Sequence, residues 1–160
     1  MQSFPQVCIR LDGEDEAGLF ERLRTVAASI GFSVEDADDL NGANGVCTHD
    51  EHRIQVLAGN SPAQRVKTLA HELGHAILHA PGEGRPDSRA VLELEAESVA
   101  FVVCAAAGIT SDDYSFGYVA TWSGGGDEAL AAIKASGTRI QGAADQILNT
   151  LEDAELAEVA

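Results

Sequence analysis

Two histidines four residues apart, His71 and His75, constrain this chain more than any other feature. On an α-helix, four residues rise about 6 Å, a little over one turn, so both imidazoles lie over the same patch and can share one ion. Glu72 projects about 100° away from His71, beside such an ion and not on it. The pattern therefore predicts two of the four corners of a zinc site, with a carboxylate that can take a proton from water.

The flanking sequence predicts that these residues lie on a helix. Ser61 is a capping residue and Pro62 suits the first helical position, while Pro81 and Gly82 end the helix after about residue 80. An apolar stripe runs along this segment, made of Val66, Leu69, Ala70, Leu73, Ile77 and Ala80. The two histidines point away from its centre, so one face packs and the other presents them. The alternative is that both are solvated residues on an amphipathic surface helix.

A catalytic zinc needs a third protein ligand and an open position for water. A second predicted helix, at about residues 88–107, offers Glu93, Glu95 and Glu97. Glu93 and Glu97 lie about 40° apart on the helical wheel, so one can bind zinc while the other hydrogen-bonds a histidine. Glu95 falls on nearly the opposite side, and we expect it to contribute little to metal binding.

The remaining elements predict one α+β domain over residues 1–160, with a core at about 14–157 and an N-terminal segment at 1–13. Two short runs at 45–49 and 53–58, the second with residues that alternate between two faces, predict a hairpin in a small antiparallel sheet, packed on a helical bundle. The other expected elements are a helix at residues 14–30, a short strand at 32–35, and a last helix at about 127–157 with a kink near Gly137 or Gly142.

Composition limits the classes of partner. The chain has 26 acidic and 10 basic residues, a net charge of -16, which repels phosphate backbones and disfavours direct nucleic-acid binding. An acidic surface serves solubility, or mimics DNA toward a basic groove. The longest apolar run, residues 99–107, is too short to cross a bilayer. Three cysteines without paired spacing imply no disulfide framework, so we expect a cytoplasmic location.

The motifs resemble a known family. Residues 71–79 read HELGHAILH and residues 93–97 read ELEAE. Together they resemble the ImmA/IrrE family of metallopeptidases and the metallopeptidase domain of ArdC-like antirestriction proteins. Residues 95–104 (EAESVAFVVC) and 114–122, which include Tyr114 and Tyr118, look particularly like the latter. The resemblance covers roughly residues 19–151.

The resemblance implies a zincin-like fold and a hairpin edge above the metal cleft that offers backbone groups to an extended peptide. It also implies Glu93 as the third ligand, with Glu97 beside a histidine, although Glu at position 97 departs from the commonest zincin pattern. We therefore expect a zinc endopeptidase with one zinc per chain, a protein or peptide substrate, and Glu72 as general base.

Other candidates and functions stay open. His79 is expected to be a structural residue at the helix C-terminus, where positive charge is favoured. Tyr114 and Tyr118 can donate a hydroxyl to an oxyanion or pack under the site. One rival function is an acidic anti-defence protein that acts by binding, with a structural or vestigial zinc site. Another is a different metal-dependent hydrolase on the same scaffold.

Overall fold

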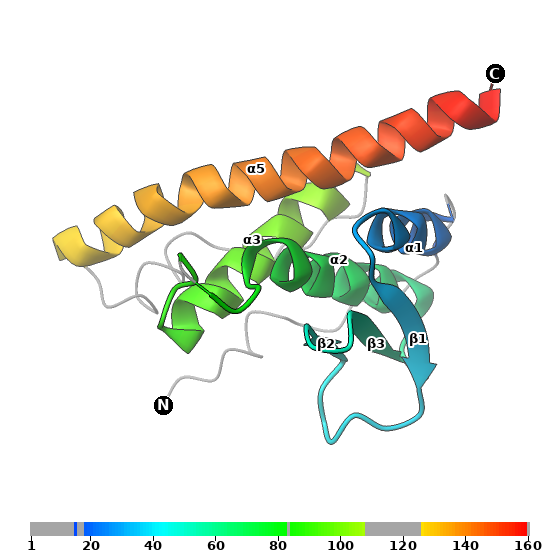
Figure 1. Cartoon of the computed structure of the whole chain (residues 1–160), viewed down its shortest axis with the longest axis horizontal. Helices are drawn as coiled ribbons and strands as arrows, with labels where there is room; N and C mark the ends of the chain where they lie inside the picture. The colour runs from blue at the N-terminus through cyan, green and yellow to red at the C-terminus, as the bar shows by residue number, and fades with distance from the viewer. Residues whose placement is uncertain (1–14, 16–17, 83, 108–125, 160) are drawn as a thin grey trace.

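The computed structural model describes residues 15, 18–82, 84–107 and 126–159. Its elements, in chain order, are α1 (Leu19–Ser29), β1 (Ser33–Ala37), β2 (Gly45–Thr48), β3 (Arg53–Leu57), α2 (Pro62–Leu78), α3 (Arg89–Ala106) and α5 (Gly126–Val159). The sheet lies on one side of α2, and α5 runs along the other side of the molecule (Figure 1). This arrangement confirms the predicted α+β class and is consistent with a zincin-like fold.

The three strands are ordered β1-β3-β2. The predicted hairpin is confirmed, because β2 and β3 pair antiparallel. However, β1 pairs parallel to β3, with Val34 opposite Ile54, so the expectation of a purely antiparallel sheet is wrong. The chain reverses at residues 38–44, where Asn41 and Gly42 adopt positive φ angles, and again in the hairpin. Two successive reversals leave β3 running in the direction of β1, and β3 lies between its two neighbours.

The helix α2 begins where the sequence predicts. The Ser61 side chain accepts a hydrogen bond from the backbone N–H of Gln64 at 3.2 Å, and Pro62 occupies the first turn. The helix ends at Leu78 and is capped by His79, whose backbone N–H donates to the carbonyl of His75 at 2.9 Å. Leu69 and Leu73 are fully buried on the packed face. The cap and the apolar stripe therefore fix which face of α2 carries the histidines.

The crossing of α2 and α3 is close because Gly74 has no side chain. A Cβ atom at Gly74 would lie 3.1 Å from the Cα of Ala96 and 3.3 Å from the Cβ of Val99. Two small residues thus allow the two helix backbones to approach. His71 and His75 lie within one turn of Gly74, and Glu93 lies within one turn of Ala96, so this approach brings the three residues together.

The helix α5 spans 34 residues and runs unbroken past Gly137 and Gly142. Its buried residues join the core formed by α1, the sheet, α2 and α3; they are Ala143, Ala144, Ile147 and Leu151. Among the helices of the described ranges, none combines the length and the apolar character needed to span a membrane.

Candidate metal centre

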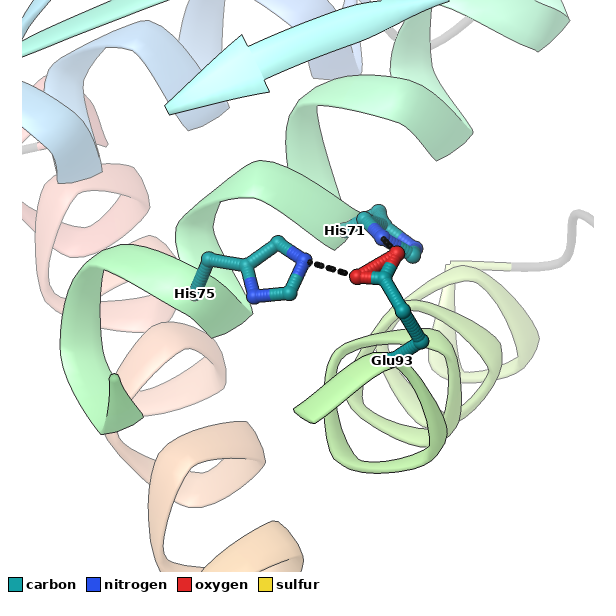
Figure 2. A group of neighbouring side chains, drawn as sticks. All are labelled: His71, His75 and Glu93. Atoms are coloured by element: carbon teal, nitrogen blue, oxygen red, sulfur yellow. Dashed lines mark ion pairs between the residues drawn. The ribbon is translucent and has the colours of Figure 1, made fainter. Parts of the chain in front are cut away.

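His71, His75 and Glu93 converge between α2 and α3. The Nε2 atom of His75 lies 2.8 Å from Oε2 of Glu93, and Nε2 of His71 lies 3.4 Å from Oε1 of the same carboxylate. Figure 2 shows both rings turned toward Glu93 from one helix. One ligand atom from each residue lies within 4.8 Å of the others, so the three could hold a metal ion.

These donors suit a tetrahedral ion. Nitrogen and oxygen ligands about 2.0–2.1 Å from a tetrahedral zinc stand about 3.3 Å from one another. The two His–Glu93 distances, 2.8 and 3.4 Å, fall on either side of that spacing. The three side chains keep 14% to 24% of their surface exposed, so the cluster has a side open to solvent.

A second carboxylate orients His71 from behind. Nδ1 of His71 lies 3.0 Å from Oε1 of Glu97 and donates to it when Nε2 binds a metal. The other oxygen of Glu97 forms an ion pair with Nζ of Lys67 at 2.9 Å, and both of these side chains are buried. The structure thus places Glu97 against a histidine and Glu93 among the ligand atoms. Hydrogen bonds of this kind fix the ring and its tautomer.

His79 contacts His75 from the side away from Glu93. Its Nδ1 atom lies 2.8 Å from Nδ1 of His75, and its Nε2 lies 2.8 Å from Oε1 of Glu95. Arg139 of α5 donates from Nε to both oxygens of Glu95, at 3.2 and 3.1 Å. His79 and Glu95 are each 1% exposed. Glu95 thus faces away from the cluster, as the wheel predicts, but is linked to it through His79.

This chain of contacts is the part of the site that sequence reasoning missed. One signal for it is that His79 follows His75 by four residues, a spacing that puts both rings on one face of a helix. Glu95 lies on an apolar helix, where a buried carboxylate needs a partner. Neither signal identifies Arg139, which is 44 residues further along the chain.

Glu72 is buried beside β2. A Cβ atom at Gly45 would lie 3.1 Å from Cγ of Glu72 and 2.5 Å from Cγ2 of Thr68, so this strand approaches α2 through a glycine. Burial raises the pKa of Glu72; the charges of His71 and His75 lower it and that of Glu93 raises it, with a net increase. A carboxyl group with a raised pKa is a stronger base.

The cluster favours a positive charge at its centre. Burial lowers the pKa of His71, but hydrogen bonds to Glu93 and Glu97 outweigh it and raise the pKa to about 10. For Glu93 the balance has the opposite sign. Burial raises its pKa, but hydrogen bonds from His71 and His75 outweigh burial and bring the pKa well below its usual value. A metal cation can replace the proton that these carboxylates stabilise on His71.

Two predicted residues cannot be placed, because Tyr114 and Tyr118 lie outside the described residues. Cys104 is buried in the core and Cys47 is packed against it, so both serve as small apolar residues. Burial raises the pKa of both thiols to about 12; the negative charge of Glu72 adds to the increase at Cys47.

Comparisons with known proteins agree with this site. The model of the IrrE N-terminal-like domain of peptidase family M78 matches residues 30–109, a range that holds all three converging residues. An uncharacterized protein of Bacillus anthracis is 28% identical over 134 residues, which cover 82% of this chain and 22% of that protein. The chain thus spans about a fifth of that relative's length. No solved structure matches the chain.

The family match covers half of the chain and includes the hairpin, α2 and α3. It confirms the predicted likeness to ImmA/IrrE proteins, whereas the closer likeness to ArdC-like domains stays a prediction. The chain belongs to peptidase family M78, a family of metallopeptidases whose IrrE N-terminal-like domain it contains.

Proposed function

We propose that this chain is a zinc-dependent endopeptidase that hydrolyses a peptide bond in an extended segment of a protein. Its metallopeptidase class follows from the family. The observation that carries the finer proposal is the convergence of His71 and His75 on the carboxylate of Glu93, with buried Glu72 next to His71 on the same helix. These are the residue types of a catalytic zinc site that keeps one position open.

The metal proposed here is zinc, one ion per chain, held by Nε2 of both histidines and a carboxylate oxygen of Glu93. When bound at these ligands, zinc supplies the positive charge that acidifies water and polarises a peptide carbonyl. The chain's own contribution is orientation: the helix spacing sets the two Nε2 atoms, and Glu97 fixes the ring of His71. Imidazole and carboxylate donors favour zinc over the harder magnesium and calcium ions.

Glu72 acts as the general base. Its carboxylate takes a proton from the attacking water and later gives it to the nitrogen of the leaving amine. Its burial and raised pKa support this role, because a weakly basic carboxylate would hold the proton poorly. A site that served structure alone would have no use for such a base, and this argues against a vestigial metal centre.

The proposed substrate is an extended segment that adds to β2. This strand lies at the edge of the sheet, with β3 as its partner among the described strands. Gly45 at the start of β2 packs on Glu72, so the edge passes close to the proposed base. Backbone pairing with a sheet edge binds a peptide whose side chains alternate between two faces. Direct nucleic-acid binding is not part of the proposal, because the net charge is -16.

An activity assay with the intact chain tests the proposal. The zinc-loaded chain is incubated with a mixed peptide library, and products are identified by mass spectrometry with and without chelator. We expect cleavage that chelator abolishes. Glu72→Gln should keep its zinc and lose at least about 100-fold in rate, since general-base catalysis contributes about 10²–10⁴-fold. Glu21→Gln, an exposed change on α1, is the matched control.

The outcomes separate the proposal from its rivals. Unimpaired cleavage by Glu72→Gln would show that the general base is another group. Zinc binding without cleavage of any peptide would favour the acidic binding protein. Cleavage of a different bond class under the same chelator control would favour another metal-dependent hydrolase.

A further inference from the structure

The helix α5 is linked to the metal cluster through two intervening side chains, although it lies outside the matched range of residues 30–109. Its Arg139 contacts Glu95 of α3, Glu95 contacts His79, and His79 contacts His75. We infer that Arg139, Glu95 and His79 form a relay that positions His75 for the metal. Its members are thus positioning residues at the end of α2, on α3 and on α5. The inference rests on the metal site of the proposed function.

Metal binding at His75 determines the direction of each hydrogen bond. With its Nε2 lone pair on a metal, a neutral imidazole carries its hydrogen on Nδ1. The Nδ1–H of His75 then donates to Nδ1 of His79, 2.8 Å away. His79 must accept there, so its own hydrogen is on Nε2 and donates to Glu95 at 2.8 Å. With a metal on Nε2 of His75, this is the one placement of hydrogens in which each donor of the relay faces an acceptor.

Glu95 completes the relay as its acceptor. A carboxylate that is 1% exposed needs compensation for the loss of water. Arg139 supplies it through Nε to both carboxylate oxygens, and Ser136 adds a hydrogen bond. Charge-assisted hydrogen bonds are about twice as strong as neutral ones, so Glu95 holds the Nε2–H tautomer of His79.

Arg139 also contacts the end of α2. Its second guanidinium nitrogen donates to the carbonyl of Leu78 at 2.8 Å, and Leu78 is the last residue of α2. The same side chain thus ties the end of the histidine helix to the carboxylate of α3. The His79 ring is therefore held in two ways. Arg139 holds the backbone just before it, at Leu78, and Glu95 holds its Nε2 atom.

The two proposed histidine ligands are therefore held by different side-chain contacts. His71 is backed by Glu97 and Lys67, which lie on α2 and α3 within the matched range. His75 is backed by His79 and Glu95, and the charge that compensates Glu95 comes from α5. A change in α5 should thus affect His75 and leave the hydrogen bond between His71 and Glu97 intact.

Metal affinity tests the relay without reference to activity. Zinc affinity is measured by competition with a chromophoric chelator for the parent chain, His79→Ala, His79→Asn and Arg139→Met. We expect His79→Ala to weaken affinity by about 10–100-fold, as loss of a partner behind a ligand does. In His79→Asn the side-chain oxygen can accept from Nδ1 of His75, so affinity should be partly rescued. Arg139→Met should also weaken it, by a smaller factor.

The matched control is Arg85→Ala. Arg85 donates from Nε to the backbone carbonyl of His79 at 3.1 Å, so this change alters the same helix end without touching the side-chain hydrogen bonds of the relay. Its zinc affinity should equal that of the parent. If Arg85→Ala weakens affinity as much as His79→Ala does, the effect is one of helix-end stability and the relay is overturned.

Ring tautomers give a second readout, measured on the unaltered chain. Long-range ¹H–¹⁵N spectra of the zinc-loaded protein should show His75 with hydrogen on Nδ1 and His79 with hydrogen on Nε2. A His79 that carries hydrogen on Nδ1 would overturn the relay even if no variant folds. A parent chain that binds no zinc would overturn the metal site itself, whereas tight zinc binding unaffected by His79→Ala would overturn the relay alone.

Discussion

Gly74 of α2 lies against Ala96 of α3, so closely that a Cβ atom on the glycine would stand 3.1 Å from the Cα of Ala96. This contact sets the spacing of the two helices that carry His71, His75 and Glu93. The ligand cluster therefore depends on a residue that makes no contact with a metal. Gly74 is also the fourth residue of the HELGH segment, so one short sequence supplies both the chemistry and the close approach.

Gly74→Ala should push α3 away from α2, because the backbone atoms it meets cannot move independently of their helix. Overpacking of this kind costs about 1–3 kcal/mol of unfolding free energy. We expect a lower melting temperature and weaker zinc binding together. Gly137→Ala in α5 is the control: among the residues that the structure describes, none comes within 4 Å of its added Cβ, and the change should stabilise the chain slightly. A variant at Gly74 that binds zinc like the parent would show that the spacing is not critical.

Gly45→Ala should act on catalysis more than on metal binding. The added Cβ would lie 2.5 Å from Cγ2 of Thr68 and 3.1 Å from Cγ of Glu72, and both contacts are too close. Relief requires β2 or the Glu72 side chain to move, which misplaces the proposed base. We expect kcat on a cleaved peptide to fall by about 10-fold or more while zinc affinity stays within about twofold. An unchanged kcat would show that the contact with β2 does not position Glu72.

Zinc binding should release a proton. In the metal-free chain, burial lowers the pKa of His71 but Glu93 and Glu97 raise it to about 10. At about pH 8 the ring is therefore protonated, and zinc must displace that proton before Nε2 can bind. Zinc affinity should increase as pH rises toward that pKa, by about tenfold per unit. Calorimetry in buffers of different ionisation enthalpy counts the protons, and release of none would contradict the cluster's arrangement.

Glu97→Gln is the matched variant for this measurement. It removes one of the carboxylates that raise the pKa of His71, so fewer protons should be released at the same pH. The variant should also bind zinc about 10–100-fold more weakly, since it loses the charged partner behind a ligand. Equal proton release from the variant and the parent would assign the proton to another group.

The sequence predicted those parts of the fold that depend on local spacing. The ends of α2 follow from Ser61, Pro62 and the proline after residue 80, and the hairpin follows from alternation. The parallel pairing of β1 with β3 could not be predicted in the same way. Alternation shows which face of a strand is buried, whereas the neighbouring strand depends on how loops reverse the chain.

The site shows the same limit. The wheel separated Glu95 from Glu93 and Glu97, but it could not choose within that pair because the two lie about 40° apart. The structure adds what the wheel lacks, because the carboxylate of Glu93 contacts the Nε2 atoms of both histidines across the crossing at Gly74 and Ala96. That Glu93 is the third ligand stays a prediction. The contact of Arg139 with Glu95 spans 44 residues and leaves no periodic signal.

Elemental analysis of the protein purified without chelators tests the central claim most directly. The account predicts about one zinc per chain in the parent and in Glu72→Gln, and loss of that zinc in Glu93→Ala, which lacks a ligand. A parent chain that is well folded and metal-free, and that gains neither zinc nor thermal stability when zinc is added, would contradict it.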